Sequence, residues 1–168
     1  SQGLDGAHAA GSYYAQEAAA MLPVEALTSG LEEEGGGGPI LAVDACAAPG
    51  GKTVQLASAL RDLGRDFAVI ANERSSSRLA SLSFNVRRCG LGPYVALTHA
   101  DASELFKTLP AKSVDLLLLD APCSGDALAR KENRTLAGHL RRAPAAGDLE
   151  ALAAVQERLL FDAWRCLK

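Results

Sequence analysis

The segment from Asp44 to Lys52, with the sequence DACAAPGGK, constrains the fold more than any other part of this 168-residue chain. It lies between a short apolar run at residues 40–43 and an amphipathic run at residues 53–63, which predicts a strand, a tight turn and a helix. Glycines let the backbone of such a turn approach a ligand, and the free N–H groups of a helix N-terminus favour negative charge. The segment therefore predicts a site for a small, polar and partly anionic ligand.

The spacing of the glycines disfavours two common nucleotide motifs. The P-loop motif requires a glycine at position 46, which is a cysteine here, and the adjacent Gly50 and Gly51 do not fit the dinucleotide motif G-x-G-x-x-G. NAD and ATP are therefore weaker candidates. On spacing alone, an ordinary βα turn without a ligand stays an open alternative.

Apolar runs and amphipathic runs alternate along the rest of the chain, which is typical of an α/β fold with a parallel sheet covered by helices. We expect an N-terminal helix that ends near Leu27, with no clear periodicity before Gly11. Ser75 and Asp148 are predicted to cap helices at their N-termini, and Gly90 to end one. The predicted strands are 40–44, 67–72, 94–98 and 114–120, and the predicted helices are 53–63, 75–88 and 148–167. The predicted organisation is an N-terminal helix and glycine-rich connection at 1–39, followed by the main domain at 40–168.

Polar residues stand where each predicted strand ends. The first strand ends at Asp44, the second is followed by Glu73, Asp101 follows the third, and Asp120 ends the fourth. Ligands of open parallel sheets bind beyond the carboxyl ends of the strands, and a carboxylate such as Glu73 can accept two hydrogen bonds from ribose hydroxyls. The four acids together predict a nucleoside-containing ligand.

Composition limits the other classes of function. The net charge of −3 gives no overall basic field, so contact with nucleic acid requires a local patch. The four cysteines form no C-x-x-C pair and accompany three histidines, which predicts neither a zinc site nor a disulfide framework. No run reaches the length of a membrane helix and no signal peptide is evident, so we expect a soluble intracellular protein. One basic cluster offers either phosphate contact or a solvated loop: Arg130, Lys131, Arg134, Arg141 and Arg142.

These motifs together resemble the Nol1/Nop2/Sun family of RNA (cytosine-5) methyltransferases. The similarity rests on Asp44–Lys52, on Ala71-Asn72-Glu73 with Arg78, on His99–Ser103 and on Asp120–Gly125. The segment 14–17, followed by 20–23, is similar to the part of the family that precedes the cofactor turn. A short similarity at residues 123–133 points to the tRNA-modifying branch.

The resemblance implies a Rossmann-like class I methyltransferase fold that binds S-adenosylmethionine. The methionine end of the cofactor is then expected at residues 46–52, its ribose at Glu73 and its adenine near Asp101. The cofactor-binding residues that the resemblance implies are Cys46, Ala47, Ala48, Pro49, Gly50, Gly51, Lys52, Glu73, Arg78, Asp101 and Asp120.

The resemblance also implies methyl transfer to C5 of cytosine in tRNA or rRNA. A cysteine thiolate adds to C6 of the ring and C5 takes the methyl group; a base then removes the C5 proton, and the thiolate leaves from C6. Cys123 matches the cysteine that assists product release, and Asp120 lies between cofactor and base. The nucleophile of the family belongs to a Thr-Cys pair after the next strand, so we expect the chain to be truncated after strand four and its following helix.

Two alternatives remain open from the sequence. One is a non-catalytic S-adenosylmethionine-binding module, or a degenerate scaffold, in a ribonucleoprotein. The other is a small-molecule or protein methyltransferase, which the Pro122-Cys123 pair disfavours because methyl transfer to nitrogen or oxygen needs no thiol. Cys166 lies on the apolar face of the last predicted helix, so we interpret it as a core residue rather than the nucleophile.

Overall fold

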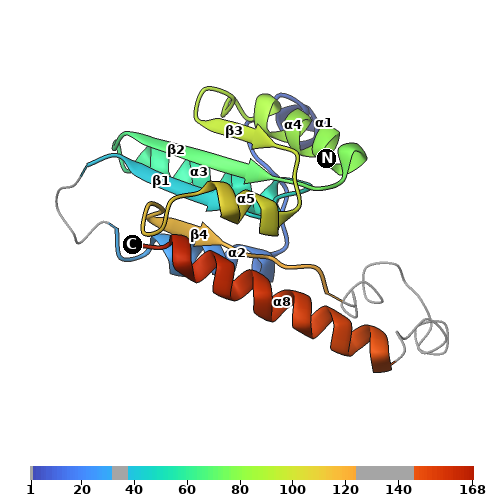
Figure 1. Cartoon of the computed structure of the whole chain (residues 1–168). Coiled ribbons are helices and arrows are strands. Elements are labelled where there is room, and N and C mark those ends of the chain that lie inside the picture. The colour runs from blue at the N-terminus through green and yellow to red at the C-terminus, as the bar shows by residue number, and fades with distance from the viewer. Residues whose placement is uncertain (1, 32–37, 124–145) are drawn as a thin grey trace.

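The protein folds around a parallel sheet of four strands in the order β3-β2-β1-β4 (Figure 1). The computed structural model describes residues 2–31, 38–123 and 146–168. The strands are β1 (Ile40–Asp44), β2 (Phe67–Asn72), β3 (Val95–Thr98) and β4 (Leu116–Leu118). The helices are α1 (Gln2–Ala9), α2 (Ala18–Thr28), α3 (Gly51–Asp62), α4 (Ser76–Arg88), α5 (Ala102–Thr108) and α8 (Ala146–Cys166).

Two apolar clusters cover the two faces of the sheet. On one face, Ala42 and Val69 pack in the cluster that includes Val24 of α2, Leu56 of α3 and Leu82 of α4. On the other face, Val43 packs with Phe106 of α5 and with residues of α8, among them Leu159, Ala163 and Cys166. Successive residues of a strand point to opposite faces, so the nearly continuous apolar runs of the strands reflect burial on both sides.

The strand register brings the predicted functional segments together. Asp44, at the end of β1, lies opposite Ala71 of β2 and Leu118 of β4. The four strands are parallel, so their carboxyl ends share one edge of the sheet and the loops that follow them converge there. The α/β prediction is confirmed, and the bounds predicted for β1 and β2 agree with the structure.

The structure corrects the sequence prediction at several elements. Helices α1 and α5 were not expected, and β4 is three residues long because Val114 forms only an isolated bridge with Leu167. Asp148 lies inside the first turn of α8 and is not its N-cap. Ser75 is the N-cap residue of α4, although its side chain makes no capping hydrogen bond.

Cys166 is fully buried at the end of α8, and its Sγ lies 3.4 Å from the carbonyl oxygen of Asp162. Burial raises the pKa of this thiol. The interpretation of Cys166 as a core residue is therefore confirmed. Among the described residues, no helix is long and apolar enough to cross a membrane.

Candidate functional site

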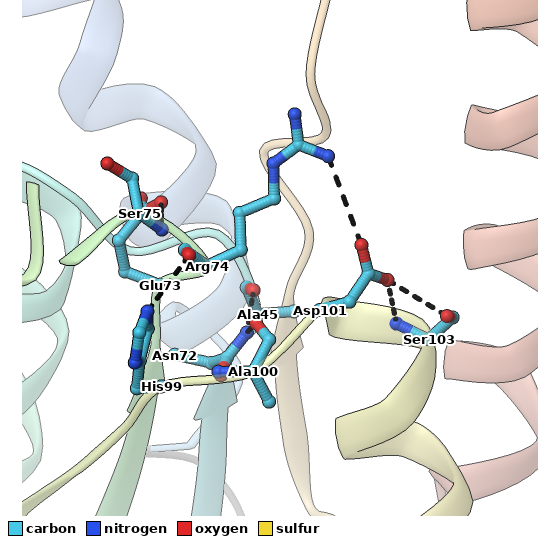
Figure 2. Close-up of polar contacts among 9 residues, drawn as sticks. All are labelled: Ala45, Asn72, Glu73, Arg74, Ser75, His99, Ala100, Asp101 and Ser103. Carbon is cyan, nitrogen blue, oxygen red and sulfur yellow. Dashed lines mark hydrogen bonds and ion pairs between the residues drawn. The ribbon is translucent and has the colours of Figure 1, made fainter.

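Asn72, the last residue of β2, connects two of the loops at the carboxyl edge of the sheet (Figure 2). Its side chain is buried, and Nδ2 donates to the carbonyl oxygens of Ala45 and Ala100, both at 3.0 Å. Oδ1 accepts from the Thr98 hydroxyl at 2.9 Å and from the Ala100 amide at 3.2 Å. The donors and acceptors of this amide are therefore all in use, and Asn72 fixes the loops after β1 and β3 to the end of β2.

Asp44 lies under the glycine turn, and its residue surface is 1% exposed. The Thr53 hydroxyl of α3 donates to Oδ2 at 2.7 Å, while Oδ1 has no hydrogen-bond partner among the residues that the structure describes. Burial raises the pKa of Asp44 to about 6, and the hydrogen bond from Thr53 opposes part of this effect. A buried oxygen without a partner, at the wall of a cavity, is an acceptor for a bound group or a water molecule.

Glu73 has a side chain that is 3% exposed, and its two oxygens have different partners. Oε1 accepts from the Ser75 amide at 2.8 Å, and Oε2 lies 3.3 Å from Nη1 of Arg78. Nη2 of Arg78 donates to the carbonyl oxygen of Ala48 at 2.6 Å. Arg78 thus ties the carboxylate at the end of β2 to the turn after β1.

Asp101 is the N-cap of α5, but half of its side chain remains exposed. Its Oδ1 accepts from both the amide and the hydroxyl of Ser103, each at 2.9 Å. The Ser103 N–H is the main reason that the pKa of Asp101 is lowered, so this carboxyl stays ionised and accepts hydrogen bonds only. Its Oδ2 faces Arg74, whose Nη1 lies 3.9 Å away (Figure 2).

The two glycines of the turn are required for different reasons. Gly50 has a φ of +109°, and a β-carbon there would lie 3.0 Å from Cδ1 of Leu82. A β-carbon at Gly51 would lie 3.0 Å from Cε1 of Tyr14 and 3.3 Å from Oε1 of Gln16. The segment before α2 therefore packs directly against the turn at Gly51.

Two neighbouring cavities open at this edge of the sheet. The larger has a volume of about 540 Å³ and extends from Glu73 and Asp101 to the loop after β4 and to α8. The smaller, of about 310 Å³, lies between the turn after β1 and the segment before α2. Cys46, Ala48 and Asp120 line both cavities, so the two spaces meet at the centre of the edge.

A charged pair stands where the cavities meet. Nζ of Lys52 donates to Oδ2 of Asp120, and the Asp120 side chain is 60% exposed. Cys46 lies nearby, and its burial raises the pKa of the thiol to about 11, with a further contribution from Asp44. Cys46 is therefore a neutral thiol at neutral pH, whereas Cys123 is exposed and lines the larger cavity.

The structure gathers nearly all of the predicted site residues around these cavities. Each residue predicted to bind the cofactor or to act in catalysis lines one or both of them, except Gly50, which packs against α4. Several other residues also line the cavities and were not predicted as site residues, although the motif at 14–17 was a signal for the first four: Tyr14, Ala15, Gln16, Glu17, Ala20, Asn72, Arg74, Ala121, Pro122, Val155 and Leu159.

The predicted basic cluster lies outside the described residues. The segment that is similar to the tRNA-modifying branch, residues 123–133, also lies outside them after Cys123. Within the described ranges, no group of three histidine, cysteine or acidic side chains could hold a metal ion.

Residues 37–168 match the protein family described as 16S rRNA methyltransferase RsmB/F, which covers more than half of the chain. The chain belongs to the RsmB/F family. Members of this family are S-adenosylmethionine-dependent methyltransferases, and the resemblance seen in the sequence is confirmed.

Relatives of the RsmB/F family match most of the chain. It is 42% identical to the ribosomal RNA small subunit methyltransferase F of Aeromonas salmonicida (strain A449) and 39% identical to that of Escherichia coli O157:H7. Each match covers 96% of this chain and 31% or 30% of the relative, respectively, so the chain spans under a third of their length.

Solved structures have the same fold. NSun6 from Pyrococcus horikoshii with SFG superposes with a TM-score of 0.71 at 27% identity, over 96% of this chain and 37% of that chain. A methyltransferase homologue from the same organism gives 0.71 at 28% identity, over 96% and 45%. The Rossmann-like methyltransferase fold is therefore confirmed.

The site fits the cofactor of the family. The ionised carboxylate of Asp101 suits an amino group as its donor, and the buried carboxylate of Glu73 suits hydroxyl groups. The Lys52 ammonium suits a carboxylate, and S-adenosylmethionine carries all three kinds of group. The site also offers Oδ1 of Asp44, a buried oxygen without a hydrogen-bond partner among the described residues.

Proposed function

We propose that this protein transfers a methyl group from S-adenosylmethionine to C5 of a cytosine in ribosomal RNA. The observation that carries the proposal is the pair of joined cavities, because they place Asp120 and the exposed Cys123 beside a row of groups suited to a nucleoside. The RsmB/F relatives are named as ribosomal RNA methyltransferases, and SFG, bound in the NSun6 structure, is an analogue of S-adenosylmethionine.

In this proposal the cofactor lies across both cavities. Asp101 accepts from the adenine amino group, and Glu73 accepts from the ribose hydroxyls with the lone pairs that Ser75 and Arg78 leave free. Lys52 meets the methionine carboxylate in the smaller cavity, where N–H groups at the start of α3 also favour an anion. When bound, the cofactor supplies an electrophilic methyl group.

Asp120 and Cys123 are the proposed catalytic residues of this chain. Asp120 lines both cavities, so its carboxylate can contact the methionine end and hydrogen-bond the target base. Cys123 assists release of the methylated base from the thiolate adduct, and the thiolate that attacks C6 is supplied by the second cysteine of the family. Cys46 is unsuited to either role, because its raised pKa keeps it protonated.

The proposal is tested by methyl transfer to 16S rRNA in the longest natural form of the protein. Isotope-labelled S-adenosylmethionine is expected to label the RNA, and mass spectrometry of digested RNA is expected to place the label on 5-methylcytosine. A label on another nucleoside, or none in a preparation that binds the cofactor, would contradict the proposal.

The role of Cys123 is tested with the variant Cys123→Ala. It is expected to accumulate a covalent enzyme–RNA adduct that survives on a denaturing gel. Cys89→Ala is the matched control, because Cys89 is half-buried against the core at the end of α4 and lines neither cavity. Equal adduct levels in the two variants would contradict the release role of Cys123.

A further inference from the structure

Arg88, the last residue of α4, contacts the N-terminal segment that leads into α2. α1 lies beside α4 (Figure 1), and Nη1 of Arg88 donates to the carbonyl oxygen of His8 in α1. The guanidinium carbon of Arg88 also lies 5.7 Å from the centroid of the Tyr14 ring, within the range of a cation–π contact. One side chain at the end of α4 therefore holds two points of the N-terminal segment.

Gly11 allows the N-terminal segment to approach α4 closely. Its φ is +79°, and a β-carbon there would lie 1.8 Å from the carbonyl oxygen of Arg88. Only glycine fits such a contact without a shift of the backbone. A β-carbon at Gly6 of α1, in contrast, would meet no other described atom within 4 Å outside its own helix. The close approach is therefore specific to Gly11 and Arg88.

The contacts of Arg88 continue to both walls of the smaller cavity. Tyr14 lines this cavity and packs on Gly51, where a β-carbon would lie 3.0 Å from Cε1 of the tyrosine. On the other side, Nη2 of Arg88 lies 3.4 Å from Oδ1 of Asn85, and Nδ2 of Asn85 donates to the carbonyl oxygen of Pro49 at 2.8 Å. Pro49 belongs to the turn after β1 and lines the same cavity. Arg88 thus connects the two walls from outside the cavity.

We propose that Arg88 is a positioning residue for the methionine end of the cofactor, because it sets the spacing between the two walls of the smaller cavity. The inference rests on the proposed function, in which Lys52 meets the methionine carboxylate in this cavity. Arg88 acts through Tyr14 and Pro49, and none of these three is among the described residues that line the larger cavity. Loss of Arg88 should therefore weaken ligands that carry the amino-acid end and leave the nucleoside end unaffected.

Calorimetric titration with two ligands separates this role from general support of the fold. S-adenosylhomocysteine carries the amino-acid end, whereas 5′-methylthioadenosine carries the nucleoside without it. Arg88→Ala is expected to weaken S-adenosylhomocysteine about tenfold and to keep 5′-methylthioadenosine within about twofold of wild type, a coupling of the size that residues outside a ligand site can have. Gly11→Ala disturbs the same contact from the other side and is expected to give the same difference between the ligands.

Two matched controls and a milder variant accompany these titrations. Arg87→Ala removes the neighbouring exposed arginine of the same helical turn, and Gly6→Ala adds a β-carbon in open space, so both are expected to bind both ligands as wild type does. Arg88→Lys keeps the charge and much of the side-chain packing, but an ammonium replaces the two-pronged guanidinium. It is expected to weaken S-adenosylhomocysteine selectively by about threefold.

Hydrogen exchange of the chain without ligand gives a second readout. The amides of residues 12–17 are expected to exchange faster in Arg88→Ala than in wild type, while those of β1 and β2 exchange at the wild-type rate. Unchanged exchange at residues 12–17 would contradict the inference, whatever the affinities are.

The inference also fails if Arg88→Ala and Gly11→Ala bind S-adenosylhomocysteine as wild type does. It fails equally if both ligands weaken to the same extent, because Arg88 would then support the whole fold rather than one cavity. A folded wild-type chain that binds neither ligand would instead overturn the proposed function, so the two failures are distinguishable.

Discussion

The inner and outer parts of the site carry similar polar groups in opposite environments. The inner residues, Asp44, Asn72 and Glu73, are at most 3% exposed, and their partners include Thr53 of α3, the Ala45 carbonyl and Arg78 of α4, respectively. The outer acids, Asp101 and Asp120, have side chains that are 50% and 60% exposed. Position at a strand end therefore does not determine a role. The inner residues stabilise the loops, although Glu73 also lines the larger cavity, and the outer acids are exposed enough to meet a ligand.

Asn72→Ala tests the inner part and is expected to have the largest effect. The substitution removes four hydrogen bonds, one buried and three partly buried, and leaves the Ala45 and Ala100 carbonyl oxygens without this donor. We expect the free energy of unfolding to fall by about 3 kcal/mol or more, measured by urea denaturation without ligand. A loss below about 1 kcal/mol would show that the loops are held by other contacts.

Asp44 is expected to make stability depend on pH. Its pKa is about 6 in the folded protein and 3.8 without burial, so the folded state holds this proton more tightly. The Asp44 contribution to the free energy of unfolding should therefore fall as pH rises from about 4 to about 6, by about 3 kcal/mol in total.

Urea denaturation of wild type and Asp44→Asn across this pH range measures that contribution. The difference between the two proteins is the informative quantity, because Asp101 and Asp115 have lowered pKa values and act in the opposite direction. Parallel pH profiles for the two proteins would contradict a raised pKa at Asp44.

Asp101→Ala is expected to separate stability from binding. Loss of the N-cap of α5 should cost about 1 kcal/mol of unfolding free energy, while affinity for S-adenosylhomocysteine should fall about tenfold or more. Asp101→Asn is the matched variant, because asparagine caps helices as well as aspartate does and should restore the stability. Unfolding of Asp101→Ala would place Asp101 with the inner, structural residues.

Asp120→Asn is expected to have the smallest effect on stability. The ion pair with Lys52 is largely exposed at Asp120, so its loss should change the unfolding free energy by less than about 1 kcal/mol. Methyl transfer should nevertheless be strongly reduced, because the substitution removes the charge between the two cavities. A large loss of stability, or unchanged methyl transfer, would remove the distinction between the inner and outer acids.

The sequence predicted the sheet and which residues gather at the candidate site, because those features depend on local patterns. The buried strands were visible as apolar runs, and the acids at their ends were visible as the residues that follow them. The motif after β1 also located the turn that Gly50 and Gly51 form.

The features that the sequence did not reveal depend on distant contacts. Helix α5 is only seven residues long and follows its N-cap, Asp101; a helix cap was one open interpretation of each strand-end acid, but the helix itself was not predicted. The smaller cavity exists because Tyr14 and Gln16 pack on Gly51 across a long stretch of chain. Glu73 is buried and Asp120 is exposed because the loops around them pack differently. The position of a residue at the end of a strand does not reveal that packing.

Calorimetric titration of the chain with S-adenosylhomocysteine, with NAD and ATP as controls, tests the central claim most directly. The account predicts saturable binding of S-adenosylhomocysteine with micromolar affinity and no binding of NAD or ATP under the same conditions. A chain that is folded by circular dichroism yet binds none of the three, or that prefers NAD or ATP, would contradict the assignment of this edge of the sheet to S-adenosylmethionine.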